Sequence, residues 1–309
     1  MFSFFKSKRL PGSVGLEVRA DGLAIAVLRP TDKASESTAI EYAYRACSAA
    51  ERESVLAELI THYHLEGMAC HVVLPIDQYQ TYPIDKPKVE ASELADASRW
   101  RIKDMLDYDL ESAVTDVYEF PADAVRGRPE QLNVVVCRKV LIEDCVNFIE
   151  QSSLELESID IADLALRNLA AQQSESSERA AAILYLRHGS GSMVVVKGGL
   201  LYLARHFDFS LQSLNEPSQQ DSVIQHLALE VQRSFDYFES QLGQHPPQKL
   251  TLIGPDPNIP LANMLGGGIA AKVEQFDVST LSKDTAPVST DLINAFVALG
   301  AALRPEGAA

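Results

Sequence analysis

The chain has 309 residues, of which 46% are hydrophobic. This is enough for a substantial core and more than one core comfortably holds, so we expect two lobes. The formal net charge of -16 argues against nucleic acid as a partner, because affinity for a phosphate backbone comes from clustered Lys and Arg. The cysteines form no C-x-x-C pair, which predicts free thiols in a reducing cytosol instead of a zinc site or a disulfide framework. They are Cys47, Cys70, Cys137 and Cys145.

Residues 1–13 are predicted to form an N-terminal tail. The first nine residues, MFSFFKSKR, place aromatic side chains before basic ones, which is not the order of a signal peptide. Contact with an anionic membrane surface and a frayed terminus are both compatible with this composition. No stretch reaches the ~18 apolar residues that span a bilayer, so we expect membrane association only through a partner.

The first lobe is expected over residues 14–171. Residues 14–28 alternate apolar and polar side chains on both sides of Asp21-Gly22, which predicts a β-hairpin. Apolar periodicity then predicts, in order, a strand at 39–45, a helix at 50–64, a strand at 71–74, a strand at 155–160 and a helix ending at Ala171.

An inserted α+β subdomain is expected within this lobe, over about residues 76–154. Three prolines mark the start of a segment with a different character, Pro75, Pro83 and Pro87. The segment is predicted to contain a polar helix at 90–106, strands at 114–120 and 132–137, and a helix at 141–150.

Residues 172–179, QQSESSER, lack apolar side chains and predict the linker between the lobes. The second lobe is expected over 180–304, with a C-terminal tail at 305–309. It is predicted to contain strands at 181–186, 193–196 and 200–207 with a turn at 189–192, a helix at 222–242, a strand at 250–254, a short helix ending at Leu265, a strand at 272–276 and a helix at 290–303. The architecture that opens the first lobe is thus repeated.

A duplicated α/β unit, with a glycine-containing hairpin opening each half and an insert in one half, resembles the actin-like (ribonuclease H-like) ATPase fold. The chain more specifically resembles the PilM family of type IV pilus assembly proteins. The stretches that carry this resemblance are 14–28, 106–114 (LDYDLESAV), 136–140 (VCRKV), 229–238 (LEVQRSFDYF) and 298–304 (ALGAALR). These stretches diverge from the main PilM family, and the chain most resembles the MshI branch, which takes part in biogenesis of the mannose-sensitive haemagglutinin (MSHA) pilus.

The resemblance implies a cytoplasmic scaffold, peripheral to the inner membrane, that docks the N-terminal tail of a PilN-like single-pass inner-membrane protein. It also implies contact with other proteins of the assembly platform or its motor. The tail would bind in a groove involving the inserted subdomain, where aromatic or aliphatic side chains are needed as anchors. The candidate anchors are Tyr82, Ile84, Trp100 and Tyr108, and each is also compatible with a place in the core of the small sheet.

The resemblance further predicts a cleft in which two hairpins face each other, cradle phosphates with backbone N–H groups and position magnesium with one carboxylate each. The first hairpin has Glu17 where the family has aspartate, and bulkier residues such as Arg19 where the family has Ser and Gly. In the second hairpin Leu186, Arg187 or His188 precedes Gly189, so the family's carboxylate is missing. Magnesium therefore loses one anchor.

We expect this cleft to be degenerate, and the residues left to contact ATP are Glu17, Arg187, Gly189, Ser190 and Gly254. Pro255 follows Gly254 in place of a Gly-Gly loop and has neither an N–H nor a free φ. Arg187 is still able to pair with a phosphate. The sequence thus predicts a pseudo-ATPase with no catalytic residue, no metal and no required cofactor. The alternative is an active ATPase whose Mg-ATP state controls partner binding. The glycines are also compatible with a purely structural role, since they supply the backbone freedom that tight turns need.

Other catalytic classes have no support, because the sequence contains no G-x-S-x-G, P-loop or H-E-x-x-H motif. His62 and His64 lie two residues apart near a helix end and point in different directions, so with His71 they do not predict a metal site. The acid-rich helix at 90–106 is compatible with a solvated face and also with attraction of a basic partner tail.

Overall fold

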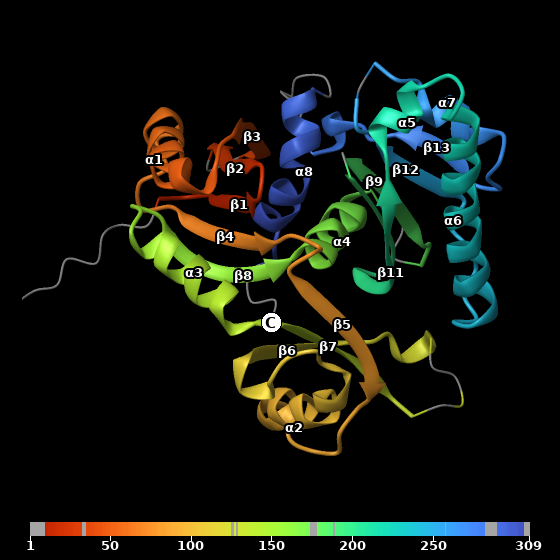
Figure 1. The fold of residues 1–309 in the computed structure, drawn as a ribbon, viewed down its shortest axis with the longest axis horizontal. Helices are drawn as coiled ribbons and strands as arrows, with labels where there is room; N and C mark the ends of the chain where they lie inside the picture. The colour runs from red at the N-terminus through yellow and green to blue at the C-terminus, as the bar shows by residue number, and fades with distance from the viewer. Residues whose placement is uncertain are drawn as a thin grey trace, which may run out of the picture.

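Figure 1 shows a computed structural model of the chain, which describes residues 10–32, 35–124, 127, 129–173, 178–187, 189–256, 258–281 and 289–305. These residues form two lobes, each built around a five-stranded sheet, and a smaller subdomain with a three-stranded sheet. Among them, no helix is both long and apolar enough to cross a membrane. Residues 1–9 of the expected N-terminal tail, residues 174–177 of the expected linker, His188 and residues 306–309 of the expected C-terminal tail lie outside the described residues.

The first-lobe sheet has the strand order β3-β2-β1-β4-β8. Its strands are β1 (Ser13–Arg19), β2 (Gly22–Asp32), β3 (Ser35–Ala46), β4 (Ala69–Leu74) and β8 (Glu155–Ile161). The predicted hairpin is confirmed, because Arg19 of β1 pairs with Gly22 of β2 across the turn. β3 continues the antiparallel part, whereas β4 runs parallel to β1 and β8 runs parallel to β4.

The second-lobe sheet repeats this topology, with the order β11-β10-β9-β12-β13. Its strands are β9 (Ala181–Arg187), β10 (Gly189–Lys197), β11 (Leu200–Phe209), β12 (Lys249–Ile253) and β13 (Lys272–Gln275). The first three are antiparallel, and β12 and β13 extend the sheet in parallel from β9. The predicted duplication is therefore confirmed in both strand order and strand direction.

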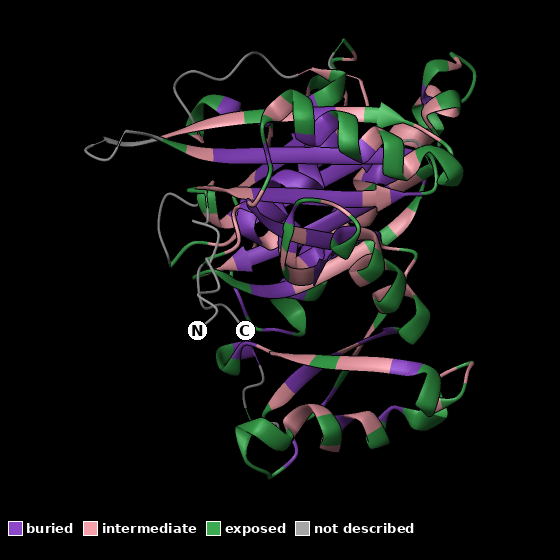
Figure 2. Ribbon diagram, turned by 90° about the vertical axis from the view of Figure 1, so that its left-hand side faces the viewer, coloured by how far each residue is buried: buried purple, intermediate pink, exposed green. Residues whose placement is uncertain are grey.

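Helices cover both faces of the two sheets. The outer face of the first lobe is covered by α1 (Arg52–Tyr63) and α3 (Lys139–Glu150), and apolar side chains of both helices pack with β1 in one core. In the second lobe α6 (Gln220–Ser240) and α7 (Leu261–Gly266) form the corresponding layer, preceded by the short α5 (Leu211–Asn215). Figure 2 shows that buried residues are concentrated in the strands of the two lobes.

Two helices lie between the sheets and join the lobes into one core. These are α4 (Ala162–Gln172) and α8 (Thr290–Ala302), whose apolar side chains pack with residues of both sheets. The two helices approach so closely that a Cβ atom on Gly300 would lie 2.1 Å from the carbonyl oxygen of Ala165. Glycine is therefore required at this crossing.

The inserted subdomain contains β5 (Tyr79–Asp85), α2 (Leu94–Arg101), β6 (Ala113–Glu119) and β7 (Gln131–Arg138), in the sheet order β5-β7-β6. β5 was not predicted, because Pro83 is unusual within a strand. It is tolerated here because β5 is an edge strand and pairs only with β7. The polar helix expected over 90–106 is shorter, with single 3₁₀ turns on both sides of α2.

Two further expectations differ from the structure. Helix α3 was assigned to the insert, but its Ile149 packs in the first-lobe core, so the small sheet itself covers residues 79–138. The turn expected over 189–192 is tighter, because β9 ends at Arg187 and β10 begins at Gly189. Gly191 lies within β10, where an added Cβ would come within 2.2 Å of the Phe207 ring.

Candidate functional site

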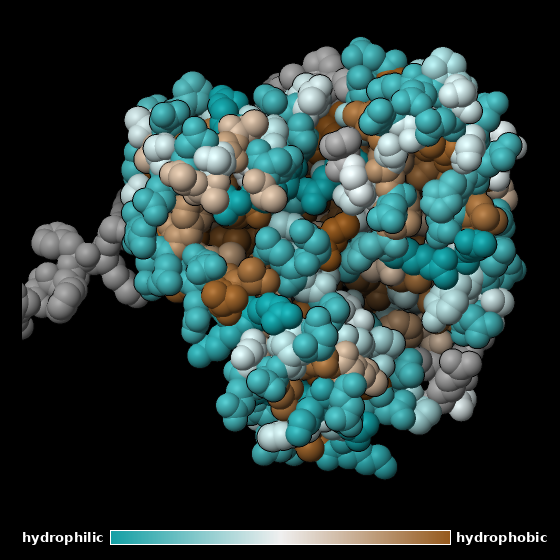
Figure 3. All heavy atoms as spheres, in the orientation of Figure 1, coloured by the Kyte–Doolittle hydropathy of each residue, from teal (hydrophilic) through white to brown (hydrophobic). Residues whose placement is uncertain are grey.

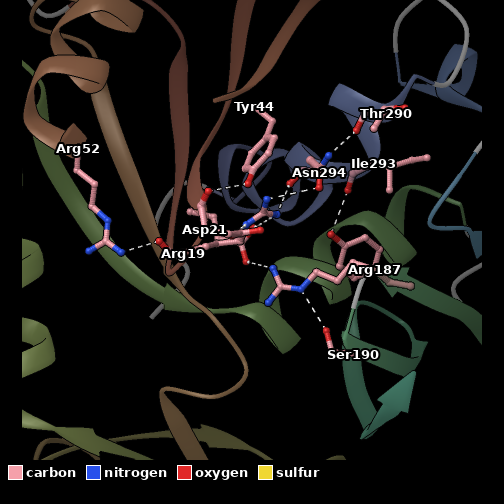
Figure 4. Close-up of polar contacts among 11 residues, drawn as sticks. Arg19, Asp21, Tyr44, Arg52, Arg187, Ser190, Thr290, Ile293 and Asn294 are labelled. Atoms are coloured by element: carbon pink, nitrogen blue, oxygen red, sulfur yellow. Dashed lines mark hydrogen bonds and ion pairs between the residues drawn. The ribbon is translucent and has the colours of Figure 1, made fainter. Parts of the chain in front are cut away.

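Glu17 and Arg187 meet where the opening hairpins of the two lobes face each other. Figure 4 shows Arg187 of the second hairpin pointing toward Arg19 of the first hairpin. Glu17 lies on β1 and is 1% exposed, and Arg187 is the last residue of β9. A guanidinium nitrogen of Arg187 lies 3.1 Å from Oε1 of Glu17 and donates a hydrogen bond to it. Two residues that the sequence proposed for nucleotide contact therefore bind each other across the lobes.

Arg19 occupies the other side of Glu17, and it is only 4% exposed. Its guanidinium lies 3.7 Å from Oε2 of Glu17 and donates a 3.1 Å hydrogen bond to the backbone carbonyl of Asn294 on α8. The Tyr44 ring packs 4.3 Å from the same guanidinium, and Asp21 forms an ion pair with its Nε at 3.1 Å. Arg19 is thus held by β3, α8 and the turn of its own hairpin.

The electrostatics of Glu17 reflect burial opposed by two cations. Burial raises the pKa of Glu17 above the ordinary carboxyl value, while the positive charges of Arg187 and Arg19 act to lower it. Oε2 of Glu17 has no hydrogen-bond partner among the described residues. The carboxylate is therefore stabilised mainly by the two guanidinium groups.

The second hairpin supplies a basic group and no acidic one in its described part. Arg187 donates a hydrogen bond from Nε to Oγ of Ser190 at 3.1 Å, which fixes the direction of its side chain. Gly189 has a positive φ of 86°, as its place in the tight turn requires. Leu186, the nearest described candidate for the missing carboxylate position besides Arg187, is fully buried in the second-lobe core.

The structure brings together only some of the proposed cleft residues. Glu17, Arg187 and Ser190 form one connected set, and Gly189 shapes the turn beside them. Gly254 follows β12 and is separate from this set. The atoms nearest to its Cβ position belong to Asp256 and Leu261. Sequence reasoning noted Arg19 only for its bulk, although the i, i+2 spacing of Glu17 and Arg19 in a strand places them on one face.

The proposed partner anchors fall into different environments. Ile84 is 8% exposed and belongs to the core of the insert, whereas Trp100 is 69% exposed. Tyr108 is half-buried, with the guanidinium of Arg138 positioned 4.1 Å from its ring centre. Tyr82 is also half-buried and lines a cavity between the insert and the second lobe. These four residues do not line a single described cavity.

That cavity, which we call the tyrosine cleft, has a volume of about 710 Å³. It is lined by residues 79–83 of β5, residues 201–206 of β11, and by Tyr118, Phe120, Ala124, Gln131, Asn133, Asp163, Tyr237 and Leu242. Figure 3 shows the surface hollowed between the inserted subdomain and the second lobe. No local sequence pattern indicates this cleft, because its lining comes from segments that are far apart in the chain.

Polar contacts connect elements on different sides of the tyrosine cleft. Nε2 of His206 on β11 lies 2.7 Å from Oδ1 of Asp163 on α4. Burial lowers the pKa of His206, but the Asp163 carboxylate outweighs this and the pKa is raised above 6.5. In the insert, Asp123 accepts hydrogen bonds from Lys197 at 3.1 Å and from Tyr202 at 2.6 Å.

In the described residues, no group of three or more His, Cys, Asp or Glu side chains could hold a metal ion. The guanidinium groups of Arg19 and Arg187 instead surround the Glu17 carboxylate where the resemblance places phosphate and magnesium. Chemically this arrangement is able to join the lobes through an ion pair.

Together, the duplicated sheets, the helices between them and the facing hairpins define a two-lobed protein with the actin-like ATPase fold. No protein-family model matches the chain, and no curated protein matches it in sequence.

The chain is similar in fold to several solved structures. The chain is similar to a structure described as the PilM-PilN type IV pilus biogenesis complex, with 20% identity, coverage of 96% of this chain and 98% of that chain, and a TM-score of 0.74. It is also similar to the cytoplasmic domain of EpsL, an inner-membrane component of the type II secretion system of Vibrio cholerae, with 12% identity, 95% coverage of both chains and a TM-score of 0.54. A Bacteroides thetaiotaomicron protein with an actin-like ATPase fold matches with 12% identity, 96% and 98% coverage, and a TM-score of 0.53.

Proposed function

We propose that this chain is a cytoplasmic adaptor of a type IV pilus assembly platform that docks the N-terminal tail of a PilN-like inner-membrane protein. The observation that carries this proposal is similarity in fold along the whole chain to the PilM-PilN complex, with a TM-score of 0.74. The inserted subdomain has its own three-stranded sheet, separate from the sheets of the two lobes, and supplies a surface for such a partner. The MSHA pilus is the system we assign to it, on the sequence resemblance to the MshI branch.

We also propose that the protein does not hydrolyse ATP. Glu17 is engaged by Arg187 and Arg19, and the described part of the second hairpin offers no carboxylate for magnesium. A phosphate entering here would compete with Glu17 for both guanidinium groups. The ion pair therefore supports a role in which the lobes are held together without nucleotide.

Two measurements test these proposals. A pull-down with the synthetic N-terminal tail of a PilN-like protein from the same organism is expected to retain the chain at low salt, and a scrambled tail is the control. Failure to retain it would contradict the adaptor. Loss of mannose-sensitive haemagglutination on deletion of the gene tests the assignment to the MSHA pilus, and normal haemagglutination would reject it.

Thermal melting with and without Mg-ATP separates the adaptor from the active ATPase. A ligand at 100 times its dissociation constant stabilises a protein by about 2.7 kcal/mol. We expect no change in melting temperature at millimolar Mg-ATP. A clear increase, together with release of phosphate, would support the ATPase instead.

A further inference from the structure

A second cavity lies where β9, β12 and β13 begin, at the opposite end of the second-lobe sheet from Arg187. It has a volume of about 420 Å³, and we call it the lysine pocket after Lys197, Lys249 and Lys272, which line it. β9 begins at Ala181, in the lining of the pocket, and ends at Arg187. Because a strand rises about 3.3 Å per residue, these two positions are about 20 Å apart. The lysine pocket is therefore distinct from the cleft between the opening hairpins.

The charge balance of the lysine pocket is opposite to that of the whole chain. Lysine and arginine outnumber the acidic residues of its lining, whereas the chain carries a formal net charge of -16. The basic residues are Arg179, Lys197, Lys249 and Lys272, and the acidic residues are Glu178 and Glu274. Cations gathered in a concave site attract anions more strongly than the same cations on an open surface, because the low-dielectric walls focus their field.

Two of the lysines share one carboxylate. Lys249 lies opposite Lys272 in the parallel pairing of β12 with β13. The Nζ atoms of both lysines lie 2.5 Å from oxygens of Glu274. Their hydrogen bonds lower the pKa of Glu274 to about 2, so the carboxylate is ionised at neutral pH. One negative charge between two ammonium groups leaves a positive charge unmatched, and an anion in the pocket would supply its counterpart.

Lys197 lines the pocket from a different strand, β10. The residue before Lys197 pairs with Ala181 of β9, and the residue after Lys249 pairs with Ala182 of β9. The two lysines therefore flank the start of β9, and their backbones are about 10 Å apart because neighbouring strands are spaced by about 4.8 Å. The short side chains of Ala181 and Ala182 lie between them and leave room for a ligand.

The side of the pocket that holds Lys197 is ordered without a ligand. Nζ of Lys197 donates a 2.8 Å hydrogen bond to Oε1 of Gln244, a side chain that is 6% exposed. Nε2 of Gln244 donates to the backbone carbonyls of Asp123 and Leu242, both at 3.3 Å. Pro246 restricts the backbone of the same loop and also lines the pocket. A preformed site reduces the ordering cost that binding must overcome.

We propose that the lysine pocket binds a small anion with at least two oxyanion groups, one contacting Lys197 and another contacting Lys249 and Lys272. Phosphorylated compounds and polycarboxylates share this chemistry, and the volume of the pocket is within the range of small-molecule sites. The pocket is separate from the proposed protein partner and from the cleft between the opening hairpins. The inference therefore goes beyond the proposed function and does not depend on it.

Isothermal titration calorimetry of the full chain with pyrophosphate and with citrate, both at low salt, tests the pocket. We expect one anion to bind per chain, and the tighter of the two probes distinguishes a phosphorylated ligand from a polycarboxylate. Acetate at the same ionic strength is the control, because its single carboxylate cannot contact both sides of the pocket at once. Absence of binding by both probes, or binding of acetate with equal affinity, would overturn the proposal.

Two substitutions with opposite expected effects locate the bound anion. Lys272→Gln should weaken binding about fivefold, because one cation is lost, and the fold should tolerate it because this side chain is 78% exposed. Glu274→Gln should strengthen binding about threefold, because the carboxylate that competes for Lys249 and Lys272 is removed. Damage to the fold would not strengthen binding, so weaker binding by Glu274→Gln would overturn the proposal.

Lys139→Gln is the matched control for the loss of one surface charge. Lys139 is 57% exposed, pairs with Glu143 at 3.3 Å and lies outside the lining of the lysine pocket. Its substitution should leave the affinity for the anion unchanged. Equal affinities of Lys272→Gln and Lys139→Gln would overturn the site, because the anion would then bind elsewhere, for example at Arg187.

Discussion

At the scale of single residues, the contact between Glu17 and Arg187 joins the two lobes across the cleft between the opening hairpins. The two residues are 170 positions apart in the chain, and each belongs to a different lobe. A buried carboxylate is costly unless cations satisfy it. A nucleotide that binds Arg187 would therefore have to break its ion pair with Glu17.

Removal of Arg187 should be destabilising. Breaking a buried ion pair commonly costs about 3–5 kcal/mol, and because Arg187 is 19% exposed we expect Arg187→Ala to cost about 2–4 kcal/mol. Addition of Glu17→Gln to this variant should restore part of the loss, because the uncompensated charge is removed. Urea denaturation measures both changes.

Arg233→Ala is the control for this experiment. Arg233 pairs with Glu230 at 3.0 Å on α6 and is 57% exposed, so its loss should cost at most about 0.5 kcal/mol. A cost of Arg187→Ala no larger than that of Arg233→Ala would show that the lobes do not depend on the buried pair.

At the scale of secondary-structure elements, the fold depends on how closely α4 and α8 approach. Gly300→Ala would direct a methyl group at the Ala165 carbonyl, 2.1 Å away, which forces the two helices apart. Overpacking of this kind costs about 1–3 kcal/mol and more where backbone must move. Thermal melting should therefore show a clear decrease, and no decrease would contradict this account of the crossing.

Gly267→Ala provides the comparison. Gly267 follows α7 with a negative φ, and no atom lies within 4 Å of its Cβ position. We expect a change within about 0.5 kcal/mol, so a similar loss in both variants would point to a general effect of the substitution and not to the helix crossing.

The ion pair that joins β11 to α4 should make stability depend on pH. Asp163 raises the folded-state pKa of His206 above 6.5, so the stabilisation is fully present below pH 6.5 and is lost as pH rises through the folded-state pKa. The melting temperatures of the unchanged chain and of His206→Gln should therefore differ most at mildly acidic pH and converge above the folded-state pKa. A difference that is constant from pH 5.5 to 9 would contradict this coupling.

At the scale of the whole molecule, the sequence predicted the duplicated architecture and missed most of what joins its parts. Alternating strands, turn residues and amphipathic helices are local signals, so the elements and their repetition could be read in order. Pro83 concealed β5, because its tolerance depends on a sheet edge that no local pattern reveals. The pairing of Arg187 with Glu17 and the gathering of five tyrosines around one cleft follow only from the tertiary fold.

The single tryptophan tests the partner surface that the sequence predicts on the insert. Trp100 is 69% exposed on the insert and does not line the cleft. We expect its fluorescence to be that of a water-exposed indole, readily quenched by acrylamide, and to stay unchanged when the partner tail binds. A shift to shorter wavelength with reduced quenching would instead mean that the tail covers Trp100. Trp100→Ala supplies the control, because it should retain tail affinity if the tail binds elsewhere and lose it if the exposed indole is the anchor.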